Sequence, residues 1–167
     1  MQRPGMLLRV STLVLGLGLA AVAAQAQGTG VALSGLQQDT SLPVEVTADS
    51  LQVDQADGSA TFSGNVKIVQ GELRLAAGEV RVEYAEEAKT IARLHATGGV
   101  TFANQADAAE ARDAVYTIDT GTIVMTGDVL LTQGPTVISG QKLVIDLKAG
   151  TGMMEGGVQT VFQPGGD

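Results

Sequence analysis

The sequence predicts an all-β fold built from repeated antiparallel hairpins. Most apolar residues recur at every second position, the spacing that places side chains on one face of a strand. Turn-forming residues separate these runs at intervals of roughly 8–12 residues, which is typical of all-β folds. Two short phrases also alternate along the chain, and such internal repeats decide the fold before any single element does.

The first phrase is an apolar–x–apolar run followed by an acid, and the second is Gly–x–Val. The glycines of the second phrase are 34, 29 and 29 residues apart, and the two phrases alternate four times. A unit of this kind cannot bury its apolar face alone, so the units are expected to stack. The first phrase occurs at Leu51–Asp54, Val80–Glu83, Tyr116–Asp119 and Leu143–Asp146, and the second at Gly64–Val66, Gly98–Val100, Gly127–Val129 and Gly156–Val158.

Apolar pairs and triplets with period 2 predict half-buried strands in chain order. Glycines and polar residues that tolerate a positive φ angle mark the tight turns between them. The turns are best predicted at Asp57–Gly58, Thr120–Gly121 and Ala149–Gly150, and at the Gly of each second phrase. The strand sets are Val44/Val46, Leu51/Val53, Val66/Ile68, Leu73/Leu75, Val80/Val82/Tyr84, Val100/Phe102, Tyr116/Ile118, Val129/Leu131 and Leu143/Ile145/Leu147.

Two stretches, Tyr84–Ala96 and Asn104–Ala114, are rich in alanine and glutamate, which are good helix formers. The repeat pattern nevertheless runs through both stretches. We therefore expect strands and turns there, and local propensity leaves helix open as the alternative.

The N-terminal residues are typical of a secretory signal peptide. Arg3 and Arg9 give a positive start, Val10–Ala23 is apolar, and Ala24–Ala26 is a small-x-small cleavage site. The apolar run is shorter than the ~20 residues of a spanning helix, so we expect export with cleavage after Ala26 rather than an uncleaved anchor. The expected organisation is a signal peptide at 1–26, a flexible segment at 27–41, the β domain at 42–163 and a flexible tail at 164–167.

Charge and composition exclude several functional classes. Without the signal peptide and its two arginines, 8 basic residues face 18 acidic ones, a net charge of −10. This balance argues against binding to nucleic acid and against broad attraction to anionic lipid surfaces. The chain has no cysteine and one histidine, His95, so it offers neither disulfides nor a two-histidine metal site.

No enzymatic motif is present. The sequence lacks a Ser–His–acid arrangement, a nucleophile elbow and a phosphate-binding GxxxxGK[ST] loop. We therefore expect no catalysis and no cofactor, and any directional work must draw its energy from a partner. The repeated acids Asp54, Glu83, Asp119 and Asp146 indicate solvated strand ends rather than paired catalytic acids.

Four segments, ADSLQVD with TFSGNVKIVQG and ARDAVYTIDTGTIVMTGDVLLTQG with ISGQKLVIDLKAG, resemble the OstA-like domain of the LptA family of periplasmic lipopolysaccharide-transport proteins. The resemblance covers about Leu42–Val161. It implies an open, V-shaped β-jelly roll of two antiparallel sheets, located in the periplasm, whose apolar interior carries lipid A acyl chains. It also implies head-to-tail joining into a bridge from the inner to the outer membrane. The implied partners are an anchored inner-membrane protein and an outer-membrane barrel protein that share the domain.

The inward face of the repeats is then the expected lipid-binding interior, with ordinary sandwich core as the alternative. Only five aromatic residues occur, so the walls are aliphatic and can adapt to acyl chains. Phe102 and Tyr116 are the first choices for lipid contact. The expected lining is Val46, Leu51, Val53, Phe62, Val66, Ile68, Val80, Val82, Val100, Phe102, Tyr116, Ile118, Met125, Val129, Leu131, Leu143 and Ile145.

An open jelly roll leaves sheet edges at its first and last strands, and unpaired edges recruit other strands. We expect the edges around Val44–Val53 and Leu143–Phe162 to join copies head to tail. The alternative is an edge blunted by Pro43 and Pro135, which cannot donate to a ladder. Two other classes remain open: an exported structural β-repeat adaptor or filament protein with a closed dry core, and a periplasmic chaperone for unfolded outer-membrane strands.

Overall fold

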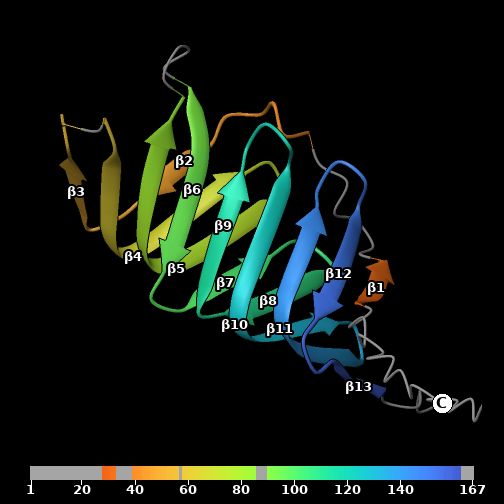
Figure 1. Ribbon diagram of the computed structural model, residues 1–167. Coiled ribbons are helices and arrows are strands. Elements are labelled where there is room, and N and C mark those ends of the chain that lie inside the picture. Colours follow the sequence, from red (N-terminus) through yellow and green to blue (C-terminus); the bar gives the residue numbers. More distant parts are fainter. Residues whose placement is uncertain (1–27, 33–38, 57, 86–89, 163–167) are drawn as a thin grey trace, which may run out of the picture.

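A computed structural model describes residues 28–32, 39–56, 58–85 and 90–162. In this part of the chain, thirteen strands form one continuous network of antiparallel pairs, and there is no helix (Figure 1). It follows that no helix among these residues has the length and apolarity needed to span a membrane. The predicted all-β class is confirmed.

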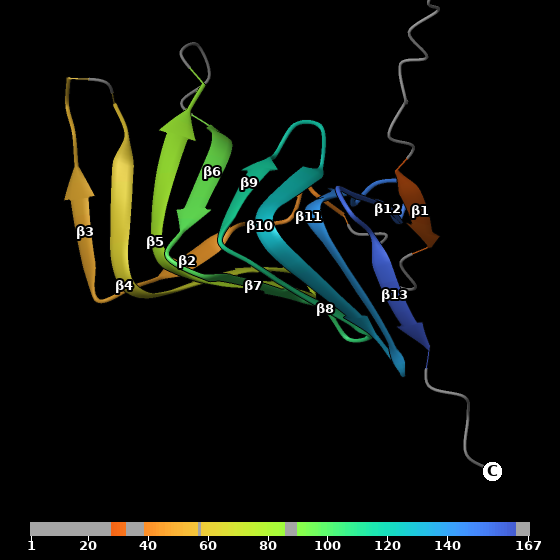
Figure 2. The ribbon, with the colours of Figure 1, turned by 60° about the horizontal axis from the view of Figure 1, so that its bottom comes forward.

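Four long strands take part in two layers. The N-terminal half of β4 pairs with β3 and its C-terminal half with β2. In β5 the N-terminal half pairs with β7 and the C-terminal half with β6. The same division recurs in the hairpin of β10 and β11, and Figure 2 shows the two layers meeting at an angle. The long strands are β4 (Ala60–Gln70), β5 (Leu73–Tyr84), β10 (Thr122–Gln133) and β11 (Thr136–Asp146).

The remaining strands extend one layer each. The first layer has the order β3-β4-β5-β6-β9-β10-β11-β12-β1, and the second has the order β2-β4-β5-β7-β8-β10-β11-β13. The short strands of the first layer are β3 (Ser50–Val53), β6 (Ile91–Thr97), β9 (Asp113–Thr117), β12 (Thr151–Glu155) and β1 (Thr29–Ala32), and those of the second are β2 (Glu45–Thr47), β7 (Val100–Ala103), β8 (Asp107–Ala111) and β13 (Gln159–Phe162).

The Gly–x–Val phrase forms the corners between the layers. In β4 and β10 the corner is a bulge at Gly64 and Gly127, whose φ angles of 80° and 86° favour glycine. A Cβ added at Gly127 would lie 2.6 Å from Nε of Arg112. The phrases at Gly98 and Gly156 connect β6 to β7 and β12 to β13. All four glycines were predicted to mark turns between strands, but two of them bend a strand without ending it.

The two stretches of helix-forming composition are strands or turns wherever the structure describes them. Tyr84 ends β5, β6 begins at Ile91, and the second stretch contains β8 and the start of β9. Residues 86–89 lie outside the described part. Cross-strand pairing and burial outweigh local helix propensity here, because each strand has a partner on both sides.

The segment expected to be flexible from 27 to 41 contains a strand, which corrects that expectation. Thr29–Ala32 forms β1 and pairs with β12, and Val31 is only 8% exposed. A run as short as TGVA carries no strand pattern of its own, so its order comes from an edge formed far away in the sequence. The predicted signal peptide, its cleavage point and the tail at 164–167 lie outside the described residues.

Candidate lipid-binding interior

The register of the first layer aligns its inward side chains in two continuous rows. Each row crosses the layer from β3 to the C-terminal strands, so neighbouring side chains in a row come from neighbouring strands. The row next to the corners is Leu51, Phe62, Val80, Ala96, Ala114, Met125, Leu143 and Met154, and the row further from them is Val53, Ala60, Val82, Leu94, Tyr116, Ile123 and Ile145, which continues past Gly152 to Val31.

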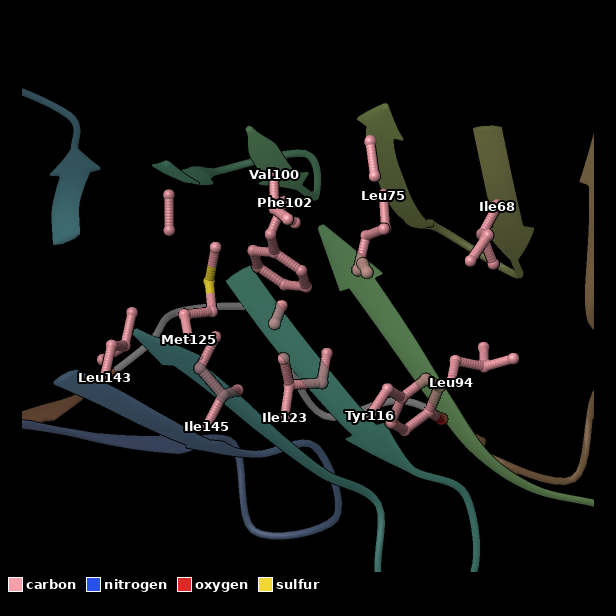
Figure 3. Packing of buried hydrophobic residues seen from close by; sticks show 14 of the residues in the cluster. Ile68, Leu75, Leu94, Val100, Phe102, Tyr116, Ile123, Met125, Leu143 and Ile145 are labelled. Carbon is pink, nitrogen blue, oxygen red and sulfur yellow. The ribbon is translucent and has the colours of Figure 1, made fainter. Parts of the chain in front are cut away.

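The second layer faces these rows with an apolar row of its own. Figure 3 shows Phe102 pointing from the second layer into the space between the layers, on the side of Ile123 and Met125. These three side chains are each 0% exposed, so the two faces pack together directly. The row of the second layer is Val46, Ile68, Leu75, Phe102, Ala109, Leu131 and Ile138.

Most of the predicted lining residues gather in this interior. Val46, Phe62 and Ile118 are partly buried against the core, whereas Leu51 and Val53 on β3 are 55% and 61% exposed. The interior is therefore filled in its middle and open at the β3 end. The predicted residues that are buried are Val66, Ile68, Val80, Val82, Val100, Phe102, Tyr116, Met125, Val129, Leu131, Leu143 and Ile145.

Several buried interior residues were absent from the predicted lining. Leu73, Leu75 and Leu147 stood in apolar pairs or triplets with period 2, so the pattern that predicted the strands could also have added them to the lining. Leu94 lay inside a stretch that resembled a helix, which hid its alternation. The other large ones are Ile123, Ile138 and Met154.

A polar contact spans the layers on the side away from the corners, which we call the mouth. The hydroxyl of Tyr116 in β9 donates a 2.7 Å hydrogen bond to Oε1 of Gln70 at the end of β4. Nε2 of Gln70 donates to the backbone oxygens of Thr40 and Leu42, at 3.0 and 2.9 Å. Burial raises the pKa of Tyr116 to about 12, so the hydroxyl remains a neutral donor at physiological pH. This contact holds both layers and the segment before β2 together.

A second polar group lies at the mouth end of the second layer. Asp107 begins β8 opposite Gln133 and is 2% exposed. Desolvation raises the pKa of its carboxyl, and a hydrogen bond with Gln133 acts in the opposite direction. The backbone N–H of Asp107 donates to Oδ1 of Asn104 at 2.6 Å. The apolar interior thus ends in polar side chains on this side.

Charged side chains lie on the outer faces. Glu83 pairs with Arg93 at 3.5 Å and with His95 at 3.3 Å, on the outside of the first layer. The histidine thus lies beside a carboxylate on a partly exposed outer surface, remote from the interior. Among the described residues, no three His, Cys, Asp or Glu side chains gather in a group that could hold a metal ion.

Comparison with known families identifies this architecture. Residues 45–151 match the family described as LptA/(LptD N-terminal domain) LPS transport protein. The chain belongs to this family. The match runs from β2 to the start of β12 and therefore includes most of the strands that build both layers of the LptA-like domain.

Two further proteins resemble this chain, one in fold and one in sequence. The crystal structure of LptH, described as the LptA-homologous periplasmic component of the lipopolysaccharide transport device of Pseudomonas aeruginosa, aligns with a TM-score of 0.67 and 19% identity, covering 75% of this chain and 99% of LptH. That likeness confirms the predicted LptA-like β-jelly roll. An uncharacterized protein of Rhizobium meliloti (strain 1021) is 29% identical over 177 residues, which cover 97% of this chain and 95% of the relative.

Proposed function

We propose that this protein is a periplasmic carrier that shields the acyl chains of lipid A between its two layers and passes lipopolysaccharide from the inner towards the outer membrane. The observation that carries the proposal is the pair of apolar rows that cross the first layer without interruption from β3 to β11, one of which continues to Met154 in β12. A carrier that passes lipid to the next carrier needs an apolar path that reaches both ends of the molecule. An ordinary hydrophobic core needs only apolar side chains that are sealed from solvent in the middle. Membership of the LptA family supplies the cargo.

Lipid enters at the β3 end, where the rows are open. Leu51 and Val53 present apolar surface to solvent, and Phe62 behind them is partly buried. Further in, an acyl chain must separate side chains that are 0–2% exposed, such as Val80 and Leu94. Each acyl CH₂ moved from water into this aliphatic environment gains ~0.8 kcal/mol, so a long chain can offset the protein contacts that it displaces.

The layers separate at the mouth. They are joined covalently along the corners, so widening the V breaks the contact between Tyr116 and Gln70 first. The family's cargo carries sugars and phosphates, and these remain in water at the mouth while the acyl chains lie between the layers. The chain has no GxxxxGK[ST] loop with which to use ATP, so a partner must supply the energy. Lipid delivered at one end then displaces lipid along sites of similar affinity.

Copies and partners join through the free edges. In the second layer, β2 and β13 are the end strands, and Val161 and Phe162 on β13 are 56% and 73% exposed. Strand addition between β13 of one copy and β2 of the next continues the layer head to tail. The same edges accept an anchored inner-membrane protein at one terminus of the bridge and an outer-membrane barrel protein at the other, each bearing a related domain. Export by the N-terminal signal peptide delivers the chain to the periplasm.

Site-specific photocrosslinking tests the carrier function. A photoreactive phenylalanine analogue is placed at Leu51 or Phe102 for the interior, and at Lys67 or Arg81 for the outer faces. We expect adducts with lipopolysaccharide in living cells from the first two positions and not from the last two. Capture confined to Lys67 or Arg81 would contradict the proposal. A titration of purified mature protein with a fluorescent lipid A analogue gives an independent measure of binding.

The filled interior supports a second candidate, an exported structural β-repeat adaptor or filament protein with a dry core. Phe102, Met125 and Leu143 are all 0% exposed, as they would be in a core that never opens. The two candidates differ in one cheap observation. Purified carrier retains extractable amphiphile or binds the lipid A analogue, whereas a dry adaptor does neither.

A further inference from the structure

The two layers differ by one strand at the C-terminal end. Within the described part of the chain, each layer has eight strands if β1 is left out: the first runs from β3 to β12 and the second from β2 to β13. Strand β1 adds a ninth strand to the first layer only, by pairing with β12. Figure 2 shows β1 at the far side of the molecule from β3.

Because of the strand directions, the extra strand β1 determines whether the first layer can continue as an antiparallel sheet into a second copy. Neighbouring strands are antiparallel throughout both layers, so the first and eighth strands of a layer run in opposite directions. A second copy placed head to tail therefore offers β2 antiparallel to β13, and β3 antiparallel to β12. With β1 in place, however, β3 of the second copy would meet a strand that runs in its own direction. One layer would continue as an antiparallel sheet while the other could not.

The side chains of β1 and β3 fit the same two inward positions. Thr29 lies opposite Met154 and Val31 opposite Gly152, at the ends of the two interior rows. If the rows continue into a second copy, Leu51 takes the position of Thr29 and Val53 that of Val31. Leu51 and Val53 are 55% and 61% exposed in the single molecule, so β3 gains more apolar burial at this edge than β1 does.

We propose that β1 is a removable cap on the assembly edge of β12, and that β3 of a second copy displaces it. This inference rests on the head-to-tail assembly proposed above and specifies how that assembly is restrained. In the single molecule, β1 satisfies the edge of β12 and prevents uncontrolled strand addition. In the bridge, β3 of the next copy replaces it, and both layers then continue with eight strands per copy. The two interior rows become continuous across the junction.

A reversible lock on β1 gives the first test. Gly30 and Met153 are register partners on the outer face, and the chain has no cysteine, so the pair Gly30→Cys and Met153→Cys can form one specific disulfide between β1 and β12. We expect the oxidised mature protein to stay monomeric by light scattering at concentrations where the reduced form assembles. Equal assembly of the oxidised and reduced forms would overturn the proposal, and so would a lack of assembly in both.

Releasing the cap gives the opposite result. Val31→Asp places a charge at the buried, inward position of β1, whereas Gly30→Asp places it at the outward neighbour and serves as the matched control. We expect Val31→Asp to assemble at a concentration at least about tenfold lower than Gly30→Asp, with circular dichroism confirming the fold of both. Equal midpoints would contradict a capping role. The disulfide pair still decides the question if Val31→Asp does not fold.

The junction itself can be trapped. Continuation of the register places Gln52 of one copy opposite Met153 of another, both on the outer face. A mixture of Gln52→Cys and Met153→Cys proteins should form a mixed disulfide, while Lys67→Cys with Met153→Cys should not. Failure of the first pair to crosslink at assembling concentrations would overturn the proposed displacement. Binding of a fluorescent lipid A analogue by the locked monomer reports the carrier function separately, so failure of the cap and failure of the carrier are distinguishable.

Discussion

Leu51 and Leu143 occupy the same interior row but have opposite environments. Leu51 on β3 is 55% exposed, whereas Leu143 on β11 is 0% exposed between two neighbouring strands. The alternation of residues around them is the same, so it does not set the difference. What differs is the number of neighbours, because β3 pairs only with β4 among the described strands. The interior is therefore open at this end because, within the described residues, β3 has a neighbouring strand on one side only, although its residues follow the same alternation as the buried strands.

The largest expected effect comes from truncating these two leucines. Leu143→Ala leaves a cavity in the filled part of the interior and should lower the free energy of unfolding by about 2–5 kcal/mol. Leu51→Ala removes the same atoms from an exposed position and should change it by no more than about 0.5 kcal/mol. Urea unfolding of the locked monomer measures both without interference from assembly. Similar losses for the two variants would refute the contrast between the ends.

Substitution of a corner glycine should have the next largest effect on stability, because the corners connect the two layers along both the open and the filled parts of the interior. Gly127→Ala forces a side chain into a backbone with φ of 86° and towards Nε of Arg112, and should lower the free energy of unfolding by about 1–3 kcal/mol. Gly30→Ala is the control, since its added Cβ meets nothing within 4 Å. Urea unfolding should place Gly30→Ala within about 0.5 kcal/mol of the parent protein. A stable Gly127→Ala protein would show that the corner does not require glycine.

The contact across the mouth should have a smaller effect on stability and a clearer one on lipid uptake. Tyr116→Phe removes the hydrogen bond to Gln70 and should lower the free energy of unfolding by about 0.5–1.5 kcal/mol. Because this bond opposes separation of the layers, binding of a lipid A analogue should become faster in stopped-flow fluorescence. Slower uptake with unchanged stability would argue that the mouth does not open there.

Asp107→Asn should give the smallest effect, and one that depends on pH. Burial raises the pKa of Asp107 above the unfolded value of 3.8, so the ionised carboxylate destabilises the native state at pH values above its folded pKa. The variant should therefore be more stable than the parent near pH 7. This gain should shrink as the pH falls through the folded pKa and disappear below 3.8, where the parent carboxyl is protonated in both states. Urea unfolding at several pH values measures the difference in free energy of unfolding between the variant and the parent. If that difference does not change with pH, ionisation of Asp107 is not its cause.

The sequence predicts the strands well because alternation is a local property. Val80 and Val82, for example, stand in a period-2 run, and both are buried. The exposure of Leu51 and Val53 could not be read in this way, because it depends on which strand lies at the edge. The bond between Tyr116 and Gln70 joins residues 46 positions apart and leaves no local signal.

Two other features were misread for related reasons. Glycine at the corners carries the same preference for a positive φ as glycine in a turn, so Gly64 and Gly127 were assigned to the commoner structure. Strand β1 was missed because a four-residue run takes its order from β12 rather than from its own pattern. In both cases the deciding interaction lies in another part of the fold.

If the protein carries lipid as proposed, the line of corners also determines on which flank the polar part of that lipid can lie in water. Backbone hydrogen bonds join neighbouring segments of the chain at the corners. The N–H groups of Asp49, Arg112 and Gln141 donate to the carbonyl oxygens of Gly64, Gly127 and Gly156, respectively. Because the layers are joined at the corners, a sugar attached to an acyl chain between the layers can leave the interior only at the mouth. In a filament of identical copies, every sugar would then emerge along a single stripe, so a bulky polysaccharide could travel the whole length without threading through the protein.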